Sequence, residues 1–369
     1  MDHEDGSPEI PEEILRHISN AKRHHYVPEF LLRRFSTSPE EEHPLIWRLD
    51  VKTGAISKPS TINCAVVHHY NRLSAASDLP SGFPEALLSY IEGLATPVIE
   101  KLVRGEMLNE AERESLSTFI MVQQQRTPRG REWQRFGHEQ AAKFWLLKQI
   151  YEHPDQSRGM LREDLGREPT ESEVDEFISK MAEPLESGEL MVSIDSDQEI
   201  LGMFVPTPDL VPLIYDMSWT LLRAPEGQSF ILSDDPLVRY DPGNPDGPTG
   251  WRSSPTVEAT LPLDPQLCLL LRQPPRTQRE MVITVERVLD INLRTYAGAR
   301  EAIFGPTEQL LESMYAATKA NPIRADLYRP KPPIFHVFER VVGDDQPFKV
   351  TRFPGPRDIK IRRGDSKKQ

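Results

Sequence analysis

Two spacings of apolar residues divide this chain and restrict the folds open to it. From Pro84 to Tyr151 the apolar residues recur at intervals of three and four, as they do on the buried side of a helix. After about residue 205 they fall into short runs, such as Leu267–Leu271, that are typical of buried strands. Helices and strands segregated along a chain indicate α+β rather than doubly wound α/β. We therefore predict a central helical region with a mainly C-terminal antiparallel or mixed sheet.

The central region divides into several predicted helices. The first begins at Pro84, and Thr96-Pro97 is expected to split it because proline removes a backbone donor. Asn109 is expected to cap the second helix, with Glu112 in the position of a capping-box acid. Three further helices are predicted, over Arg129 to Tyr151, Thr170 to Met181 and Val288 to Phe304.

Strand signals lie on both sides of the helical region. Residues 45–56 predict a hairpin, in which Asp50 and Thr53 precede a glycine, Gly54, that can adopt a positive φ. Three later runs are also predicted to be strands, the first two paired about a Pro-Glu-Gly turn: Trp219–Arg223, Ser229–Leu232 and Met281–Val285.

Composition limits the class of protein and its partners. The 369 residues carry a net charge of −13, and a field of that sign repels phosphate backbones. This charge disfavours a broad nucleic-acid surface but leaves room for a local basic pocket. Cys64 and Cys268 form no CxxC pair, so neither a disulfide framework nor a cysteine-rich zinc site is expected. The chain shows no signal peptide and no bilayer-length apolar run, which predicts a cytoplasmic protein without membrane contact.

The predicted domain organisation has three parts. Residues 1–21 are polar and acidic and are expected to form a mobile tail. Residues 22–318 are expected to form a single α+β domain. Residues 319–369 are rich in proline and basic side chains, which predicts an irregular C-terminal tail whose last 20 residues are mobile.

Candidate site residues stand out where polar side chains interrupt apolar patterns. His24-His25 precedes a helix start that needs no histidine, and His25 could serve as a base, an acid or a ligand, or could simply cap the helix. Gln123 and Arg126 continue the apolar stripe of their helix. A buried guanidinium needs an acid or an anion, and Glu92 is the first candidate acid. That pair could equally be structural.

A second candidate follows an apolar strand directly. Ser233-Asp234-Asp235-Pro236 places carboxylates at a strand end, where the strand fixes their position for catalysis or metal binding. Asp-Pro is also a common turn former, so the segment could be a turn with no chemical role.

Three segments of the chain together resemble one family. His25-Tyr26-Val27-Pro28-Glu29-Phe30, with Arg33 and Phe35, is similar to its N-terminal HYVP signature. Ser233-Asp234-Asp235-Pro236 resembles its second signature, an SDxP strand end in which asparagine is usual where Asp235 stands. Leu261-Pro262-Leu263-Asp264-Pro265 and Asn292 resemble its C-terminal pattern. The family is the domain of unknown function 4238, found largely in bacteria, and the resemblance covers about residues 22 to 305.

The resemblance implies that these scattered residues share one site. We therefore predict a polar site built from His25, Glu92, Gln123, Arg126 and Asp234. One hypothesis is a metal-dependent hydrolase or nuclease-like phosphoesterase, with a divalent metal as the possible cofactor and Arg126 as an anion clamp. The alternative is a non-catalytic module that binds a small anionic ligand or a protein partner. Metal binding that needs both His25 and Asp234 would separate the two.

Overall fold

The computed structural model describes residues 11–190, 193–205, 207–247, 249–251, 254–322, 327–329, 335–340 and 348–353. The chain forms two compact units. The first contains residues 1–131 and 196–333, and the second contains residues 132–195 and 334–369. The predicted domain boundaries near residues 22 and 318 stay predictions. The predicted mobility of residues 1–10 and 354–369 falls outside the described residues.

Helices fill the middle of the chain, as the apolar spacing predicted. In the described ranges the helices are α1 Glu12–Leu15, α2 Glu29–Arg34, α3 Phe83–Val103, α4 Glu110–Arg126, α5 Pro128–Glu152, α6 Pro154–Leu165, α7 Glu171–Ser187, α8 Ser196–Gly202, α9 Thr207–Asp216, α10 Val285–Gly298 and α11 Glu308–Ala320, with a 3-10 turn at Thr61–Asn63.

The strands lie on both sides of these helices in the sequence. They are β1 Arg23–His25, β2 Trp47–Asp50, β3 Ile56–Ser57, β4 Val66–His68, β5 Ser218–Arg223, β6 Leu232–Ser233, β7 Val238–Tyr240, β8 Glu258–Asp264, β9 Leu267–Arg272, β10 Thr277–Val282, β11 Ala302–Gly305, β12 Phe335–Arg340 and β13 Phe348–Phe353. The largest sheet has the order β10-β5-β9-β8-β7 and is mixed, since β10 runs parallel to β5 while the other neighbours are antiparallel. The α+β class is therefore confirmed.

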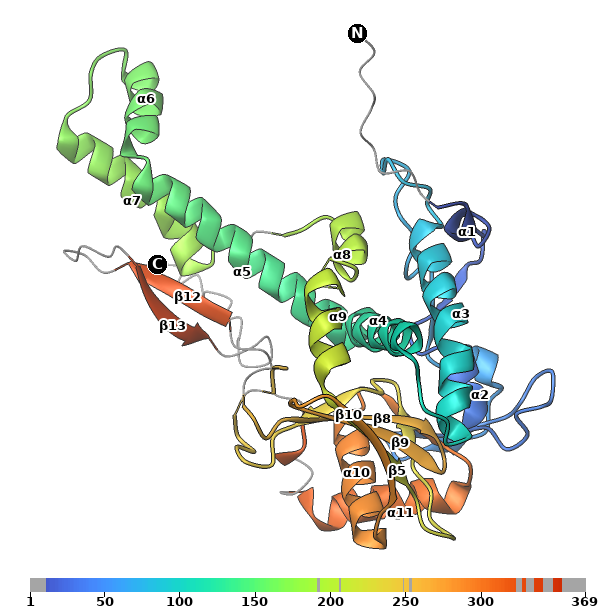
Figure 1. Cartoon of the computed structure of the whole chain (residues 1–369). Helices are drawn as coiled ribbons and strands as arrows, with labels where there is room; N and C mark the ends of the chain where they lie inside the picture. The colour runs from blue at the N-terminus through green and yellow to red at the C-terminus, as the bar shows by residue number, and fades with distance from the viewer. Residues whose placement is uncertain are drawn as a thin grey trace. The chain divides into compact units, whose positions relative to one another are not determined.

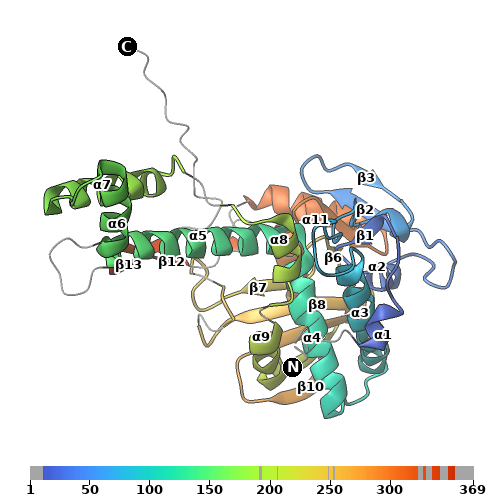
Figure 2. The ribbon, with the colours of Figure 1, turned by 90° about the horizontal axis from the view of Figure 1, so that it is seen from above.

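The inner strands β5, β8 and β9 are buried on both faces, which explains why they are mainly apolar, whereas the edge strand β10 is largely exposed. Alternate residues of β9 face opposite sides. Leu269 and Leu271 join the core formed with α3, α4 and α9, whereas Cys268 and Leu270 join the core formed with α10. Figure 1 shows the same layers, with α4 and α9 on one side of the sheet and α10 on the other, and Figure 2 shows α4 and α9 over the first side. The first face carries the helices from which the candidate site is built.

Local signals placed several elements correctly. Asn109 and Thr170 form the capping boxes of α4 and α7. The predicted hairpin is β2-β3, in which Asp50 Oδ1 accepts from Thr53 N at 2.9 Å. Gly54 ends the turn at φ 76°.

Tertiary packing overrode other local signals. The predicted split at Thr96-Pro97 is wrong, because α3 runs through Pro97. Thr96 Oγ1 donates to Glu92 O at 2.8 Å, and Val98, Ile99 and Leu102 bury the last turn against the core. This burial outweighs the cost of an internal proline, about 3 kcal/mol.

Strand partners were also mispredicted. Trp219–Arg223 is β5, which pairs with β9 and β10, whereas β6 pairs with β11 in a four-stranded sheet of order β3-β2-β11-β6. The predicted helix over Val288–Phe304 ends at Gly298, because Ala302–Gly305 forms β11 between β2 and β6. Strands β12 and β13 form an antiparallel hairpin within the predicted irregular tail.

Helices dominate the second unit. Its α6 and α7 pack together, and Arg158 Nη2 on α6 pairs with Glu171 Oε2 on α7 at 2.6 Å. Tyr151 Oη on α5 donates to Glu186 Oε1 on α7 at 2.5 Å. None of the predicted site residues lies in this unit.

Candidate functional site

The two adjacent histidines of β1 have different environments. β1 pairs antiparallel with β4, so successive side chains point to opposite faces of this ribbon. His24 is buried, its Nε2 lies 2.9 Å from Ala21 O, and its Nδ1 accepts from Asn71 N at 2.8 Å. His24 thus joins β1 to the segment before it through Nε2 and to the segment after β4 through Nδ1. His24 is a structural residue.

His25 instead keeps one ring nitrogen open. Its Nε2 is buried and has no hydrogen-bond partner among the described residues. Burial lowers the pKa of His25, and the charge of Arg126 lowers it further, while Glu92 opposes this change. A lowered pKa keeps the imidazole neutral near pH 7. A neutral ring can accept a proton or coordinate a metal.

Gln123 and Arg126 meet at a single backbone carbonyl. Both lie on the buried side of α4, three residues apart, so they project from the same face. Gln123 Nε2 donates to Tyr26 O at 2.9 Å, and Arg126 Nε donates to the same oxygen at 3.1 Å. The residue after His25 therefore anchors the polar end of the α4 stripe.

Arg126 is one of the largest fully buried side chains in the described structure, at 1% exposure. Its Nη1 lies 2.5 Å from Glu92 Oε1 on α3, the acid predicted to be its first partner. Two polar atoms remain without a hydrogen-bond partner among the described residues, Arg126 Nη2 and Gln123 Oε1, and both are buried. We call His25, Glu92, Gln123 and Arg126 the His25–Arg126 cluster. It contains a donor and an acceptor that the described protein atoms leave unused.

Asp234 occupies a different position. It follows β6, and its two carboxylate oxygens accept from the backbone amides of Arg300, Glu301 and Ala302 at 2.8, 2.7 and 3.2 Å. In the described part of the chain no hydrogen bond or ion pair joins Asp234 to Arg126. Burial raises the pKa of Asp234 to about 6, although the backbone donors oppose this shift.

Tyr26 connects Asp234 with the cluster. Its carbonyl receives Gln123 and Arg126, and its phenol lies in the field of the Asp234 carboxylate. Burial raises the pKa of Tyr26, and the charge of Asp234 raises it further. Tyr26 was not singled out as a site residue because its main contribution comes from the backbone.

Two further buried arginines complete the junction of α4 and α5. Arg129 Nε pairs with Asp235 Oδ2 at 2.7 Å, at the strand end that the SDxP segment forms. Arg131 stacks on the ring of Tyr70 with 3.6 Å between its Cζ and the ring centroid, and it bonds to Asn71. Asn71 in turn bonds to Glu85, whose pKa is raised by burial. The sequence signal was present, since three arginines follow the apolar stripe within six residues.

The described residues contain neither a metal-binding cluster nor a membrane-spanning helix. Across the described ranges, no group of three or more His, Cys, Asp or Glu side chains is placed to hold a metal ion. Among the same residues, the helices are too short or too polar to span a bilayer.

The chain belongs to a known protein family. Residues 23–309 match the family described as a protein of unknown function, DUF4238. This match includes β1, α3, α4, the five-stranded sheet and the whole His25–Arg126 cluster. Comparisons with curated proteins and with solved structures gave no match.

Proposed function

We propose that this protein binds a small anionic ligand, with a carboxylate or phosphate group of that ligand placed at the His25–Arg126 cluster. One observation supports this most directly. Three buried polar atoms, His25 Nε2, Gln123 Oε1 and Arg126 Nη2, have no hydrogen-bond partner among the described residues. Buried polar groups are normally satisfied, and each one left unpaired costs about 1–3 kcal/mol. A bound group that pairs with them removes this cost.

The open atoms favour a particular chemistry. Arg126 Nη2 can only donate, and Gln123 Oε1 can only accept. His25 Nε2 can accept or donate, according to its tautomer. The complementary group therefore has an acceptor oxygen next to an O–H, as in a monoprotonated phosphate, whereas a carboxylate would satisfy only the donors among the three atoms. A bridging water molecule would satisfy the same atoms, and it is the alternative that an experiment must exclude.

The test is the thermal stability of the full chain in acetate, sulfate and inorganic phosphate, with and without Arg126→Lys. A ligand at about 100 times its Kd stabilises the native state by about 2.7 kcal/mol. We expect at least one of these anions to raise the Tm of the wild type. Arg126→Lys should remove this increase, because lysine keeps the charge but cannot reproduce the forked geometry.

Arg113→Lys is the matched control. Arg113 lies on the same helix and is 3% exposed, but it donates to the backbone carbonyls of Tyr215 and Met217. The control should lose stability yet keep the response to the anion. If no anion raises the Tm of the wild type, or if both variants keep the response, the cluster is structural and the proposal fails.

Hydrolysis of a phosphoester is the second candidate function, and one observation favours it. The lowered pKa of His25 leaves a neutral imidazole that can act as a general base next to the Arg126 guanidinium. In this version Glu92 and Asp234 are the further acid–base or metal-binding groups, and a divalent metal is the cofactor. The test is hydrolysis of p-nitrophenyl phosphate and its bis-ester with Mg²⁺, Mn²⁺ or Zn²⁺. Activity that His25→Ala leaves unchanged would count against it.

We also propose a cellular location for the protein. We place it in the bacterial cytoplasm, where the buried thiols of Cys64 and Cys268 would stay reduced.

A further inference from the structure

A surface pocket lies on the same ribbon as His25. It has a volume of about 210 Å³ and is lined by Arg23, Val66 and His68. The pairing of β1 with β4 places Arg23 opposite His68 and His25 opposite Val66. Because side chains alternate along a strand, these four share one face of the ribbon. The pocket is therefore next to His25 and on the same side of the sheet.

Arg23 is held in place by neutral groups. Its Nη2 donates to Ile62 O at 2.8 Å and to Asn63 Oδ1 at 2.6 Å. Among the described residues no carboxylate pairs with Arg23, whereas Arg126 and Arg129 each have one. The guanidinium is thus oriented while its charge is not neutralised, and Nε and Nη1 stay available for a ligand.

The charge of the pocket lining is opposite in sign to the net charge of the molecule. The chain carries a net charge of −13, yet the pocket is lined by an arginine, a histidine and a valine. A local positive field on an acidic protein attracts anions to that place and not elsewhere. A histidine beside an arginine adds a second N–H donor for an anionic oxygen.

The walls of the pocket are fixed by strained backbone at both ends of β4. Ala65 and His69 have φ of 49° and 56°, a region that residues other than glycine seldom adopt. Tyr26 N donates to Ala65 O at 2.9 Å, and His69 N donates to Lys22 O at 2.7 Å. Such strain persists only where the surroundings impose it, and it is frequent at binding sites.

We propose that this pocket binds the phosphate group of a small phosphomonoester, with Arg23 and His68 as its donors. The volume of about 210 Å³ exceeds the ~150 Å³ of a protein cavity that holds a benzene molecule, so it accommodates a phosphate and several attached atoms. The rest of such a ligand would extend along the shared face toward His25. That extension rests on the function proposed for the His25–Arg126 cluster, whereas the phosphate pocket does not.

The test is calorimetric titration of the full chain with inorganic phosphate, together with NMR spectra of selectively labelled histidines. We expect a Kd of about 1 mM or tighter, a typical strength for a single small group, and a shift of the His68 resonance. Arg23→Gln and His68→Gln should each weaken binding by about tenfold, since charge-assisted hydrogen bonds are lost. Arg16→Gln, at an exposed arginine paired with Glu12, should leave the affinity unchanged.

The outcomes separate the pocket from the buried cluster. If Arg23→Gln loses phosphate binding and Arg126→Lys keeps it, the result supports the pocket as the phosphate site. Phosphate binding then gives no support to the His25–Arg126 cluster. The reverse pattern overturns the pocket and supports the cluster. Absence of binding to the wild type at phosphate concentrations on the order of 10 mM, well above the expected Kd, also overturns the pocket. The pocket is also overturned if Arg23→Gln and His68→Gln both bind phosphate with wild-type affinity.

Discussion

At the scale of single residues, Tyr26 is the backbone partner of the buried polar end of α4. Its carbonyl oxygen takes one hydrogen bond from Gln123 and another from Arg126. The charge of the Asp234 carboxylate contributes to raising the pKa of the Tyr26 phenol. Tyr26 therefore ties the segment after His25 to the buried end of α4, and Asp234 affects this residue only through the pKa of its phenol.

Asp234 should leave a mark on the pH dependence of stability. Its folded pKa of about 6 exceeds its ordinary value of 3.8, so the native state binds more protons between these two values. This contribution to stability is complete below pH 3.8 and is lost as pH rises through 6, in total about 3 kcal/mol. We predict that the loss of stability caused by Asp234→Asn is larger at pH 4 than at pH 7, as measured by urea unfolding.

A larger loss of stability at pH 7 than at pH 4 would contradict this prediction. If Asp234→Asn is more damaging at pH 7, the three amide donors dominate and hold the native pKa below the unfolded one. The assignment of a raised pKa to Asp234 would then be wrong.

Some of these residue contacts could be predicted from the sequence. The stripe of α4 ends in Gln123 and Arg126, so their burial and the need for an acid followed from helical spacing alone. The acceptor Tyr26 O could not be predicted, because every residue carries a carbonyl and only the fold decides which one faces α4. The same reason applies to Asp234, whose donors are backbone amides 66 to 68 residues away.

At the scale of elements, the junction of α4 and α5 positions the buried arginines. α4 ends at Arg126, Thr127 adopts extended backbone, and α5 begins at Pro128. A Cβ at Gly130 would lie 2.1 Å from Gln124 O and 2.8 Å from Gln125 O in the last turn of α4. The close approach of the two helices therefore requires glycine at this position.

We predict that Gly130→Ala destabilises the protein by about 3 kcal/mol, because backbone carbonyls cannot move aside as a side chain can. Gly93→Ala is the matched control, since Gly93 is exposed on α3 and no atom lies within 4 Å of its added Cβ. The control should gain about 0.5–1 kcal/mol from the better helix propensity of alanine. Equal effects of the two substitutions in chemical unfolding would refute the close approach.

Element types were easier to predict than element partners. The apolar period of α3 and α4 is a local property, so these helices were found from spacing. The partners of β5 are β9 and β10, about 50 to 60 residues further along, and nothing local distinguishes them from β6. Pro97 is a further position at which a local signal misled, because packing against residues far away in the sequence keeps α3 continuous through this proline.

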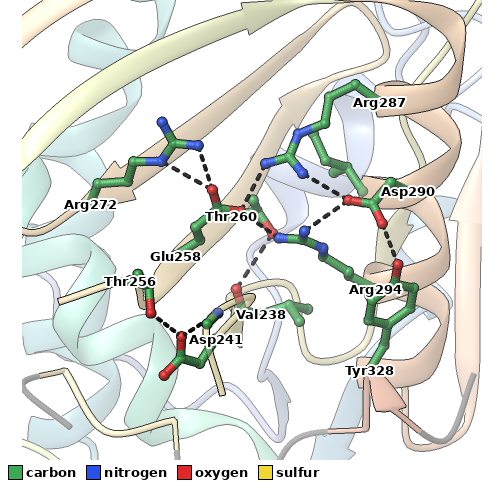
Figure 3. Close-up of polar contacts among 12 residues, drawn as sticks. Val238, Asp241, Thr256, Glu258, Thr260, Arg272, Arg287, Asp290, Arg294 and Tyr328 are labelled. Carbon is green, nitrogen blue, oxygen red and sulfur yellow. Dashed lines mark hydrogen bonds and ion pairs between the residues drawn. The ribbon is translucent and has the colours of Figure 1, made fainter. Parts of the chain in front are cut away.

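At the scale of the whole molecule, an ion network joins the sheet to α10 (Figure 3). Glu258 on β8 accepts from Arg272 on β9 and from Arg287 and Arg294 on α10. Burial alone would raise the pKa of Glu258, but the charges of Arg294 and Arg287 outweigh it and lower the pKa to about 2. Asp290 pairs with Arg287 and Arg294 and also accepts from Tyr328, which follows α11.

Glu258→Gln should weaken this connection in a pH-dependent way. The stabilisation from a pKa lowered from 4.5 to about 2 is present above pH 4.5 and is lost as pH falls toward 2, about 3 kcal/mol in total. We predict a loss of at least this size at pH 7 that shrinks on acidification. Glu280→Gln, at the more exposed pair with Arg223, should cost about 1 kcal/mol or less. A loss for Glu258→Gln no larger than that of this control would show that the network is not stabilising.

The most direct test of the account is a crystal structure of the full chain grown with phosphate or acetate. The His25–Arg126 cluster is predicted to hold an anionic group within hydrogen-bonding distance, about 3 Å, of both His25 Nε2 and Arg126 Nη2. Electron density for that group between the two atoms would establish the cluster as a ligand site. A single water molecule there, or direct contact between protein atoms that leaves no room for a ligand, would contradict the central claim.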